Sequence, residues 1–437
     1  MKSQIVIGAT NSGCGKTTLT MGLLRVLKRR GLLVQPFKCG PDYIDTQFHT
    51  LASGSQSVNL DTWMASEEHV REVYSRYGAD SDVCVTEGVM GLFDGYDRMK
   101  GSTAEIAMLI KVPVVLVVNA SSTAYSVAAL LFGFKHFHPQ LNVVGVVFNQ
   151  VSSESHYRFL EEACREVGIV SLGYMPKNEG IRVPSRHLGL TLMVKRKMES
   201  LIEEVADMVQ AYVDVDRLLE ITSVSFTILP EKENLRRKPM KIAVAYDAAF
   251  NFVFRENIDG LKKQGTVSFF SPLKDKHLPI ADWVYLPGGY PELFASRLQR
   301  NKQLMEEIKT YAERDGKILA ECGGMMFLTQ SIVTDKRKEY PMCGVLPFKS
   351  TMSQARLHLG YRSMDMQGET WKGHEFHYSE LENPEALPSM AKLKNAKGKE
   401  VDTSIYRYKN VIAGYTHWYW GEKDIFKLWE NNGTDIY

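Results

Sequence analysis

Short apolar runs alternate with helical stretches through the first half of the chain. The runs are rich in β-branched residues and have the length of buried strands, whereas the stretches between them repeat their apolar positions at helical spacing. This alternation predicts a mostly parallel sheet with helices on both faces. The predicted strands are Gln4–Ile7, Leu33–Phe37, Val83–Thr86, Val114–Val118 and Val143–Phe148. The predicted helices are Lys16–Arg30, Glu67–Tyr77, Thr103–Ile110, Ala124–Phe134 and Glu154–Val167.

The alternation thins after about Ala211, and a charged segment then separates two halves of the chain. Residues 230–240 have no apolar period and contain prolines at both ends, so we predict a linker there. A second α/β unit follows. Its predicted elements are strands at Lys241–Tyr246, Trp283–Leu286 and Lys317–Ala320, a helix around Asn301–Arg314, and short strands within Tyr340–Arg362. We therefore predict an α/β fold with two domains, residues 1–229 and residues 241–437.

Composition narrows the class of protein. A length of 437 residues fits two or three domains. Lysine and arginine number 53 against 51 acidic residues, a net charge of +2. This balance argues against nucleic acid or an anionic membrane as a partner, because such binding needs clustered positive charge, but it allows one local basic pocket.

The remaining composition indicates a cytoplasmic protein. The 6 cysteines include no C-x-x-C pair, so neither a disulfide scaffold nor a zinc framework is indicated. The N-terminus lacks the pattern of a signal peptide. The longest apolar run, Val112–Val118, is far shorter than the roughly 20 residues that span a bilayer.

A glycine-rich loop follows the first predicted strand and leads into the first predicted helix. Gly8–Thr18 reads G-x6-G-K-T, whereas the strict phosphate-loop pattern would place a glycine at Thr10. The loop would bring backbone N–H groups and a helix N-terminus to phosphate oxygens, although a plain helix cap is the alternative. We expect ATP to bind here, with the lysine at its phosphates and the first threonine on Mg²⁺. The expected residues are Gly13, Gly15, Lys16, Thr17 and Thr18.

Acidic residues follow the next two predicted strands. Asp42 and Asp45 come after the second strand and Glu87 ends the third, so both groups are expected at the ligand-binding edge of a parallel sheet. We predict that they position Mg²⁺ and that Lys38 neutralises transferred charge. Turn or cap chemistry is the alternative for the acids. Asn149, at the end of the fifth strand, could contact a nucleobase or satisfy backbone groups.

A second candidate site lies in the second half. Cys322 sits at a sharp turn between a predicted strand and helix, with two glycines after it. A nucleophile at such an elbow is exposed, and we expect the helix N-terminus to lower the pKa of its thiol. The glycine turn at Leu286–Glu292 could complete an oxyanion hole. The alternative for the cysteine is a buried apolar residue.

The thiol needs a general base, and His417 is the best candidate. His374 and His377 compete for the role, but they lie in H-E-x-H, one residue short of the zinc motif H-E-x-x-H. We therefore expect a structural or site-shaping polar cluster around those two histidines. An ATP site and an activated thiol in one chain suggest that glutamine supplies ammonia, which attacks a carboxylate activated as an acyl phosphate.

At this point the chain resembles a known family over essentially its whole length, the cobyrinate a,c-diamide synthases. The matching segments are Gly8–Thr18, Pro36–Asp45, Glu87–Gly95, Gly101–Ala107, Arg186–Leu190, Asp247–Phe252, Leu286–Ala295, Ala320–Leu328, Gly373–Glu380 and Gly414–His417. The resemblance implies a P-loop domain similar to dethiobiotin synthetase, followed by a class I glutamine amidotransferase domain. It also implies that Cys322 is the nucleophile and His417 its activator. Position 419 is Tyr, where many class I amidotransferases have a third, acidic member, so a Cys-His dyad is expected.

The resemblance further implies ATP- and Mg²⁺-dependent amidation of the a and c carboxylates of cobyrinic acid, with L-glutamine as nitrogen donor. The anionic corrin could be held by Arg182, Arg186, His187 and Arg356, or these could be solvated surface charges. Another tetrapyrrole, such as nickel-sirohydrochlorin or hydrogenobyrinic acid, is the close alternative. A partitioning or scaffold ATPase is the alternative from another class. The oligomeric state stays open, with a homodimer considered.

Overall fold

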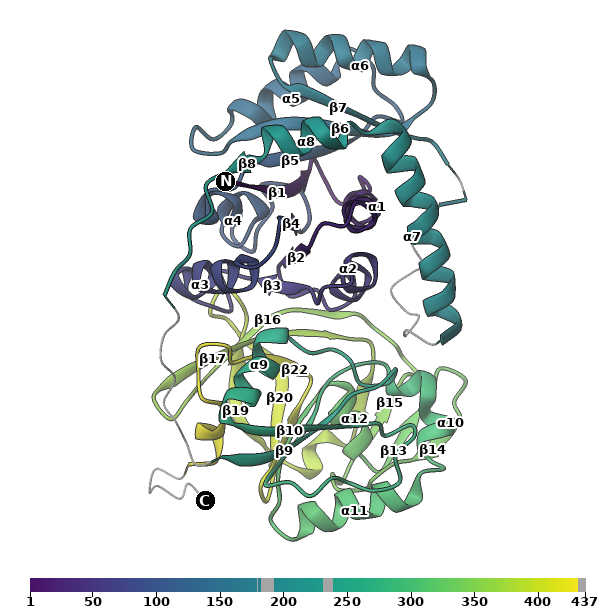
Figure 1. The fold of residues 1–437 in the computed structure, drawn as a ribbon. Coiled ribbons are helices and arrows are strands. Elements are labelled where there is room, and N and C mark those ends of the chain that lie inside the picture. Colours follow the sequence, from purple (N-terminus) through teal and green to yellow (C-terminus); the bar gives the residue numbers. More distant parts are fainter. Residues whose placement is uncertain (179, 182–191, 231–238, 431–437) are drawn as a thin grey trace. The chain divides into compact units, whose positions relative to one another are not determined.

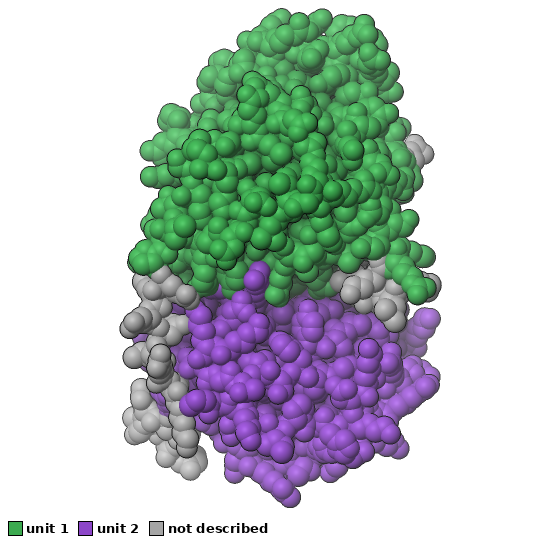
Figure 2. Space-filling model, viewed as in Figure 1, with its two compact units in different colours: residues 1–186, 192–232 green, residues 187–191, 233–437 purple. Residues whose placement is uncertain are grey.

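The computed structural model describes residues 1–178, 180–181, 192–230 and 239–430, which fall into two compact units. Figure 2 colours unit 1 green and unit 2 purple. The described residues up to 230 belong to unit 1, and those from 239 onward belong to unit 2. Most of the predicted linker, 230–240, lies outside the described residues.

Unit 1 is built on a parallel sheet with the strand order β3-β2-β4-β1-β5-β6-β7. A short β8 pairs antiparallel with the beginning of β1. Nearly every residue of the central strands is buried, as expected for strands covered on both faces. The strands are β1 (Lys2–Ala9), β2 (Val34–Cys39), β3 (Val58–Leu60), β4 (Val83–Glu87), β5 (Val114–Asn119), β6 (Val143–Val151), β7 (Val170–Pro176) and β8 (Ser223–Val224).

Helices cover both faces of this sheet, with α1, α2 and α7 on one side and α3 and α4 on the other (Figure 1). Serine side chains begin three of them: Ser66, Ser102 and Ser153 each accept a hydrogen bond from an N–H of the first turn. The helices are α1 (Lys16–Arg29), α2 (Asp45–Ser53), α3 (Glu67–Gly78), α4 (Thr103–Ile110), α5 (Val127–His136), α6 (Glu154–Val167), α7 (Leu192–Tyr212) and α8 (Val215–Ile221).

The predicted parallel sheet is confirmed, and the bounds of α4 and α6 agree with the prediction at both ends. The helix predicted from Ala124 begins three residues later, at Val127. The elements of unit 1 that were not predicted are β3, β7, β8, α2, α8 and α7. The last of these buries a helical stripe against α1: a side chain at Gly22 would collide with Val205 and Val209, and Arg25 forms an ion pair of 2.9 Å with Glu199.

Unit 2 contains a larger mixed sheet with the strand order β10-β9-β11-β12-β21-β20-β19-β16-β17-β22. Neighbouring strands pair parallel in the part of this order that reads β10-β9-β11-β12-β21. The remaining neighbours, from β21-β20 to β17-β22, pair antiparallel. A small separate sheet has the order β14-β13-β15-β18. Because β22 pairs with β17, the C-terminal part of the chain meets the strand that carries His374 and His377.

The strands of unit 2 are β9 (Met240–Ala245), β10 (Gly265–Phe270), β11 (Trp283–Leu286), β12 (Lys317–Glu321), β13 (Ser331–Val333), β14 (Glu339–Pro341), β15 (Lys349–Thr351), β16 (His358–Met366), β17 (Glu369–His377), β18 (Glu380–Glu382), β19 (Ser389–Lys394), β20 (Glu400–Tyr408), β21 (Val411–Gly414) and β22 (Thr416–Tyr419). Its helices are α9 (Arg255–Gln264), α10 (Ala295–Leu298), α11 (Lys302–Glu313) and α12 (Gly323–Leu328), with 3₁₀ turns η1 (Pro291–Phe294), η2 (Pro384–Ala386) and η3 (Ile425–Trp429). The strands, the helix and the short-strand region predicted for this half are present. In neither unit does the described part of the chain contain a helix that is long and apolar enough to cross a membrane.

Candidate active sites

The glycine-rich loop connects β1 to α1 and has a backbone that requires glycine. Gly13 and Gly15 adopt positive φ angles of 80° and 96°, in the left-handed region that side chains disfavour. A Cβ on Gly15 would also lie 2.1 Å from Nδ2 of Asn149. That Nδ2 donates a hydrogen bond of 2.8 Å to the carbonyl of Cys14. The loop is therefore held in shape from β6, and the Lys16, Thr17 and Thr18 side chains follow in the first turn of α1.

This contact also bears on the role predicted for Asn149. Its Oδ1 accepts from the N–H of Gln150 at 2.9 Å, so both ends of the amide are engaged with backbone groups. The contacts in the structure are those of the alternative reading, in which Asn149 satisfies backbone groups. Contact with a nucleobase stays a prediction.

Glu87, the last residue of β4, is the centre of a buried polar cluster beside the loop. Its Oε1 accepts from Thr17 Oγ1 at 2.7 Å and lies 2.8 Å from Lys38 Nζ. Nζ of Lys38 also lies 2.7 Å from Oδ2 of Asp45. The structure thus brings together four of the predicted site residues, from α1, β2, α2 and β4.

The charges in this cluster depend on one another. Burial disfavours a charged Glu87, but the Lys38 ammonium and the His49 ring outweigh it and hold the pKa of Glu87 well below its usual range. Burial raises the pKa of Asp45 to about 6 against the attraction of Lys38. Burial also opposes the charge of Lys38, yet Asp45 and Glu87 raise the pKa of Lys38 above its usual value. Glu87 is therefore ionised at neutral pH, and an oxygen ligand of this kind suits Mg²⁺.

His49 is a member of this cluster that the sequence analysis did not identify. Its Nε2 lies 2.5 Å from Oε2 of Glu87, and both side chains are fully buried. The only sequence signal was its position in α2, one turn after Asp45. Asp42 has a different place: its Oδ1 accepts from the N–H groups of Ile44 and Asp45, which is the turn chemistry named as its alternative. Its assignment to Mg²⁺ stays a prediction.

In unit 2, Cys322 occupies a strained elbow between β12 and α12. Its φ and ψ angles are 47° and −107°, outside the regions that non-glycine residues prefer. The N–H of Cys322 donates to the carbonyl of Gly414 at 2.7 Å, and the thiol points to the carbonyl of Phe376 at 3.7 Å. The predicted strand-turn-helix geometry is therefore present.

The prediction that the helix N-terminus lowers the pKa of the thiol is wrong. The side chain is only 3% exposed, and burial raises the pKa of the Cys322 thiol, with the Glu292 carboxylate adding to the effect. A backbone hydrogen bond from Gly323, the first residue of α12, lowers the pKa of the thiol but does not offset desolvation. Burial thus favours the neutral thiol of Cys322, so the predicted nucleophile would need a base that removes its proton.

The glycine turn after β11 packs against the His417 ring and against the two glycines that follow Cys322. A Cβ on Gly288 would lie 2.0 Å from Cε1 of His417, and one on Gly323 would lie 3.0 Å from N and O of Gly289. A Cβ on Gly324 would meet the carbonyl oxygen of Leu286 at 2.0 Å. The glycines on both sides therefore permit a close packing that places the turn against the nucleophile elbow and the histidine ring.

His417 lies within β22, opposite His374 of β17. It is 1% exposed, and burial lowers the pKa of its ring to about 3, with the neighbouring His374 and His377 adding to the effect. A neutral imidazole is the form that can accept a proton from a thiol. Nδ1 of His417 lies 3.9 Å from Oε2 of Glu321, a carboxylate that the sequence analysis did not assign.

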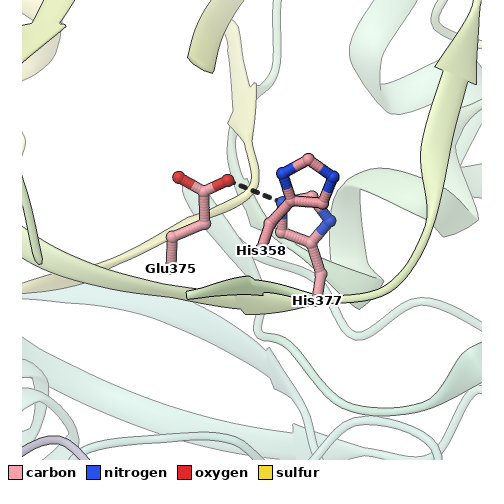
Figure 3. Close-up of side chains that lie close together, drawn as sticks. All are labelled: His358, Glu375 and His377. Atoms are coloured by element: carbon pink, nitrogen blue, oxygen red, sulfur yellow. Dashed lines mark hydrogen bonds and ion pairs between the residues drawn. The ribbon is translucent and has the colours of Figure 1, made fainter. Parts of the chain in front are cut away.

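Figure 3 shows His358, Glu375 and His377, whose potential ligand atoms lie within 4.8 Å of one another. Nε2 of His377 contacts Oε1 of Glu375 at 2.7 Å, and its Nδ1 lies 2.8 Å from the carbonyl of Ser379. The rings of His358 and His377 are stacked, with centroids 4.7 Å apart. Both ring nitrogens of His377 thus already have protein partners, which is the arrangement of a hydrogen-bonded polar cluster.

Four residues were predicted as possible binders of the corrin carboxylates, and the structure describes only one of them, Arg356. Arg182, Arg186 and His187 lie outside the described residues. Arg356 is exposed, and its N–H donates to the carbonyl of Tyr378 at 3.1 Å. Its role stays a prediction.

Comparison with protein families agrees with both units. Residues 5–190 match the model of the CobQ/CobB/MinD/ParA nucleotide binding domain. Residues 241–425 match the model of the CobB/CobQ-like glutamine amidotransferase domain. The fold and the two sites thus define a glutamine amidotransferase joined to a nucleotide-binding domain.

Comparison with individual proteins is more specific. The chain is 39% identical to the cobyrinate a,c-diamide synthase of Priestia megaterium, over 98% of this chain and 96% of that protein. It is also 39% identical to the enzymes of the same name from Caldanaerobacter subterraneus, over 94% of each chain, and Listeria monocytogenes serovar 1/2a, over 95% of this chain and 96% of the other. The chain belongs to the cobyrinate a,c-diamide synthase family.

Proposed function

We propose that this protein uses ATP and glutamine to amidate the a and c carboxylates of cobyrinic acid, in the cytoplasm, as a step of cobalamin synthesis. Family membership over nearly the whole chain supports the substrate. The proposed release of ammonia from glutamine is supported by the turn at Gly288, which packs against both the Cys322 elbow and the His417 ring. A partitioning or scaffold ATPase would have no use for this second site.

In the glutamine half, Cys322 passes its proton to His417 and attacks the side-chain amide carbon of glutamine. The Gly288–Gly289 backbone and the N–H groups after Cys322 would stabilise the oxyanion that forms. His417 then returns the proton to the leaving nitrogen, so that ammonia departs and a thioester remains. Water hydrolyses the thioester to glutamate and restores the thiol.

In the synthetase half, Gly13, Gly15, Lys16 and Thr18 would hold the ATP phosphates at the N-terminus of α1. The Thr17 hydroxyl and the ionised Glu87 carboxylate are adjacent oxygen ligands of the type that Mg²⁺ prefers, and Asp45 and Asp42 lie nearby. When bound, Mg²⁺ would neutralise charge on the phosphates. Lys38 would neutralise charge on the transferred group. The carboxylate of the corrin attacks the γ-phosphorus, ADP leaves, and ammonia displaces phosphate from the acyl phosphate.

The substrate is tested by incubating the protein with ATP, Mg²⁺ and glutamine together with either cobyrinic acid or nickel-sirohydrochlorin. We expect the a,c-diamide from cobyrinic acid, detected by mass spectrometry. Failure with cobyrinic acid and formation of a diamide from nickel-sirohydrochlorin would overturn the choice of substrate. Nucleotide hydrolysis that ignores glutamine and both tetrapyrroles would overturn the enzyme class.

The division of labour is tested by two variants. Cys322→Ala should abolish synthesis from glutamine but leave synthesis from added ammonium, because only ammonia release needs the thiol. Lys16→Ala should abolish synthesis from both nitrogen sources, because the acyl phosphate forms before either is used. If ammonium does not rescue Cys322→Ala, the thiol has a further role.

A further inference from the structure

Glu321, the residue directly before the nucleophile, lies against the histidine that should activate it. Oε2 of Glu321 is 3.9 Å from Nδ1 of His417, and both side chains are almost fully buried. The contact follows from the sheet: Glu321 is the last residue of β12, and β22, which carries His417, passes beside it.

The carboxylate is oriented by two hydrogen bonds. The Tyr285 hydroxyl donates to Oε2 at 2.6 Å, and the N–H of Trp418 donates to Oε1 at 3.0 Å. Among the described residues, no lysine or arginine forms an ion pair with Glu321. The group beside it that can become a cation during the reaction is the imidazole of His417.

Besides Glu321 and Cys322, three titratable groups that affect the pKa of His417 come from β17. They are His374, His377 and Glu375. Glu375 is the other carboxylate, but its oxygens already contact Arg362, His377 and the Thr403 hydroxyl. Both carboxylates thus have hydrogen-bond partners, but those of Glu375 include the Arg362 guanidinium, whereas those of Glu321 are the neutral Tyr285 hydroxyl and the Trp418 N–H. Among the described residues, Glu321 is therefore the carboxylate whose charge no lysine or arginine already balances.

We propose that Glu321 is a positioning residue for His417. It takes the role of the acidic third member of a Cys-His-acid triad, because this chain has Tyr419 at the usual position of that acid. The ionised carboxylate favours the tautomer with hydrogen on Nδ1, so that the lone pair of Nε2 accepts the thiol proton. It then stabilises the imidazolium that results. The inference rests on the proposed glutamine half of the function and adds a third residue to it.

The ionisation of Glu321 gives the inference a pH signature. Burial raises the pKa of Glu321 to about 8, whereas the hydrogen bonds from Tyr285 and Trp418 lower it. The proton is released to solvent as the pH rises, and only the ionised form can orient His417. Glutamine hydrolysis should therefore increase through this pH region.

The test measures glutamine hydrolysis by the full chain as a function of pH, with ammonium-supported synthesis measured in parallel. Glu321→Gln should lower kcat at least about tenfold, change KM for glutamine less than about twofold and lose the increase near pH 8. Synthesis from ammonium should stay within about twofold of the unaltered protein. Glu313→Gln, the same change at an exposed glutamate that pairs with Lys409, is the matched control and should leave every value unchanged.

Tyr285→Phe is a second variant that keeps the carboxylate. Loss of the Tyr285 hydrogen bond should move the pH increase to higher pH while the maximal kcat stays within about threefold. The proposal is overturned if Glu321→Gln keeps the kcat and pH profile of the unaltered protein, or if Tyr285→Phe leaves the pH increase where it was. The proposed function itself is judged separately, by glutamine hydrolysis and diamide synthesis in the unaltered chain.

Discussion

The ring of His417 fills the space that a side chain at Gly288 would need, since a Cβ there would lie 2.0 Å from Cε1. We therefore expect Gly288→Ala to displace either the His417 ring or the backbone of the glycine turn that would bind the oxyanion. Glutamine hydrolysis should fall at least about a hundredfold, in line with the loss of an oriented base or an oxyanion donor. Synthesis from ammonium should be unaffected, which a coupled assay with the two nitrogen sources would measure.

The matched control for this change is Gly260→Ala in α9. A Cβ there meets nothing within 4 Å, so alanine should leave activity unchanged and stabilise the helix slightly. Full glutamine hydrolysis by Gly288→Ala would contradict the close packing of the turn against His417.

Gly15→Ala should disable the nucleotide site. An alanine here would have an unfavourable φ of 96°, and its Cβ would lie only 2.1 Å from Nδ2 of Asn149. The loop and the Asn149 side chain of β6 therefore cannot both keep their positions. Equilibrium binding of ATP should weaken at least about tenfold, while glutamine hydrolysis measured alone should persist. Gly133→Ala in α5, where the space is open, is the control. Unchanged ATP affinity in Gly15→Ala would show that the loop tolerates a different geometry.

Lys38→Met should destabilise unit 1. The change leaves the buried carboxylates of Glu87 and Asp45 without the ammonium that lies within 3 Å of both. Removal of one partner from a buried charge cluster costs about 3–5 kcal/mol of unfolding free energy. Urea unfolding at pH 7 would measure this loss, and synthesis should fall with both nitrogen sources. Lys409→Met, at an exposed ion pair with Glu313, should cause no measurable loss. Equal stability of the two variants would contradict the assigned role of Lys38.

Glu375 should contribute a pH-dependent part of the stability of unit 2. Burial opposes its charge, but His377, Arg362 and Thr403 outweigh it and lower the pKa of Glu375 to about 2. An acid with a lowered folded-state pKa stabilises the fold above its unfolded pKa of about 4.5 and loses that contribution as the pH falls towards 2. The shift corresponds to about 3 kcal/mol at neutral pH.

Glu375→Gln tests this contribution. The difference in unfolding free energy between the unaltered chain and the variant should be largest at pH 6–7 and shrink between about pH 4.5 and pH 3. Urea titrations at several pH values would measure it. A difference that stays constant over this range would mean that Glu375 stabilises the fold by packing rather than by charge.

The sequence alone was sufficient for the features that depend on local order. The strand, loop and helix around Lys16 and the strand, elbow and helix around Cys322 are contiguous, so their residue types and spacing identify both sites. The same holds for α4 and α6, whose serine caps and apolar spacing are continuous in the chain. It was less informative for α7, whose buried stripe depends on docking to α1, and for α2, where no helix was predicted.

Only the tertiary structure decided the partners and the charges. His49 reaches Glu87, and Glu321 reaches His417, across 38 and 96 residues of chain, and no local pattern encodes either contact. The strand-turn-helix motif predicts that a helix N-terminus lowers the pKa of Cys322, whereas burial raises it. The physical reason is that a motif specifies which groups are present, while desolvation and the positions of distant charges determine how those groups ionise.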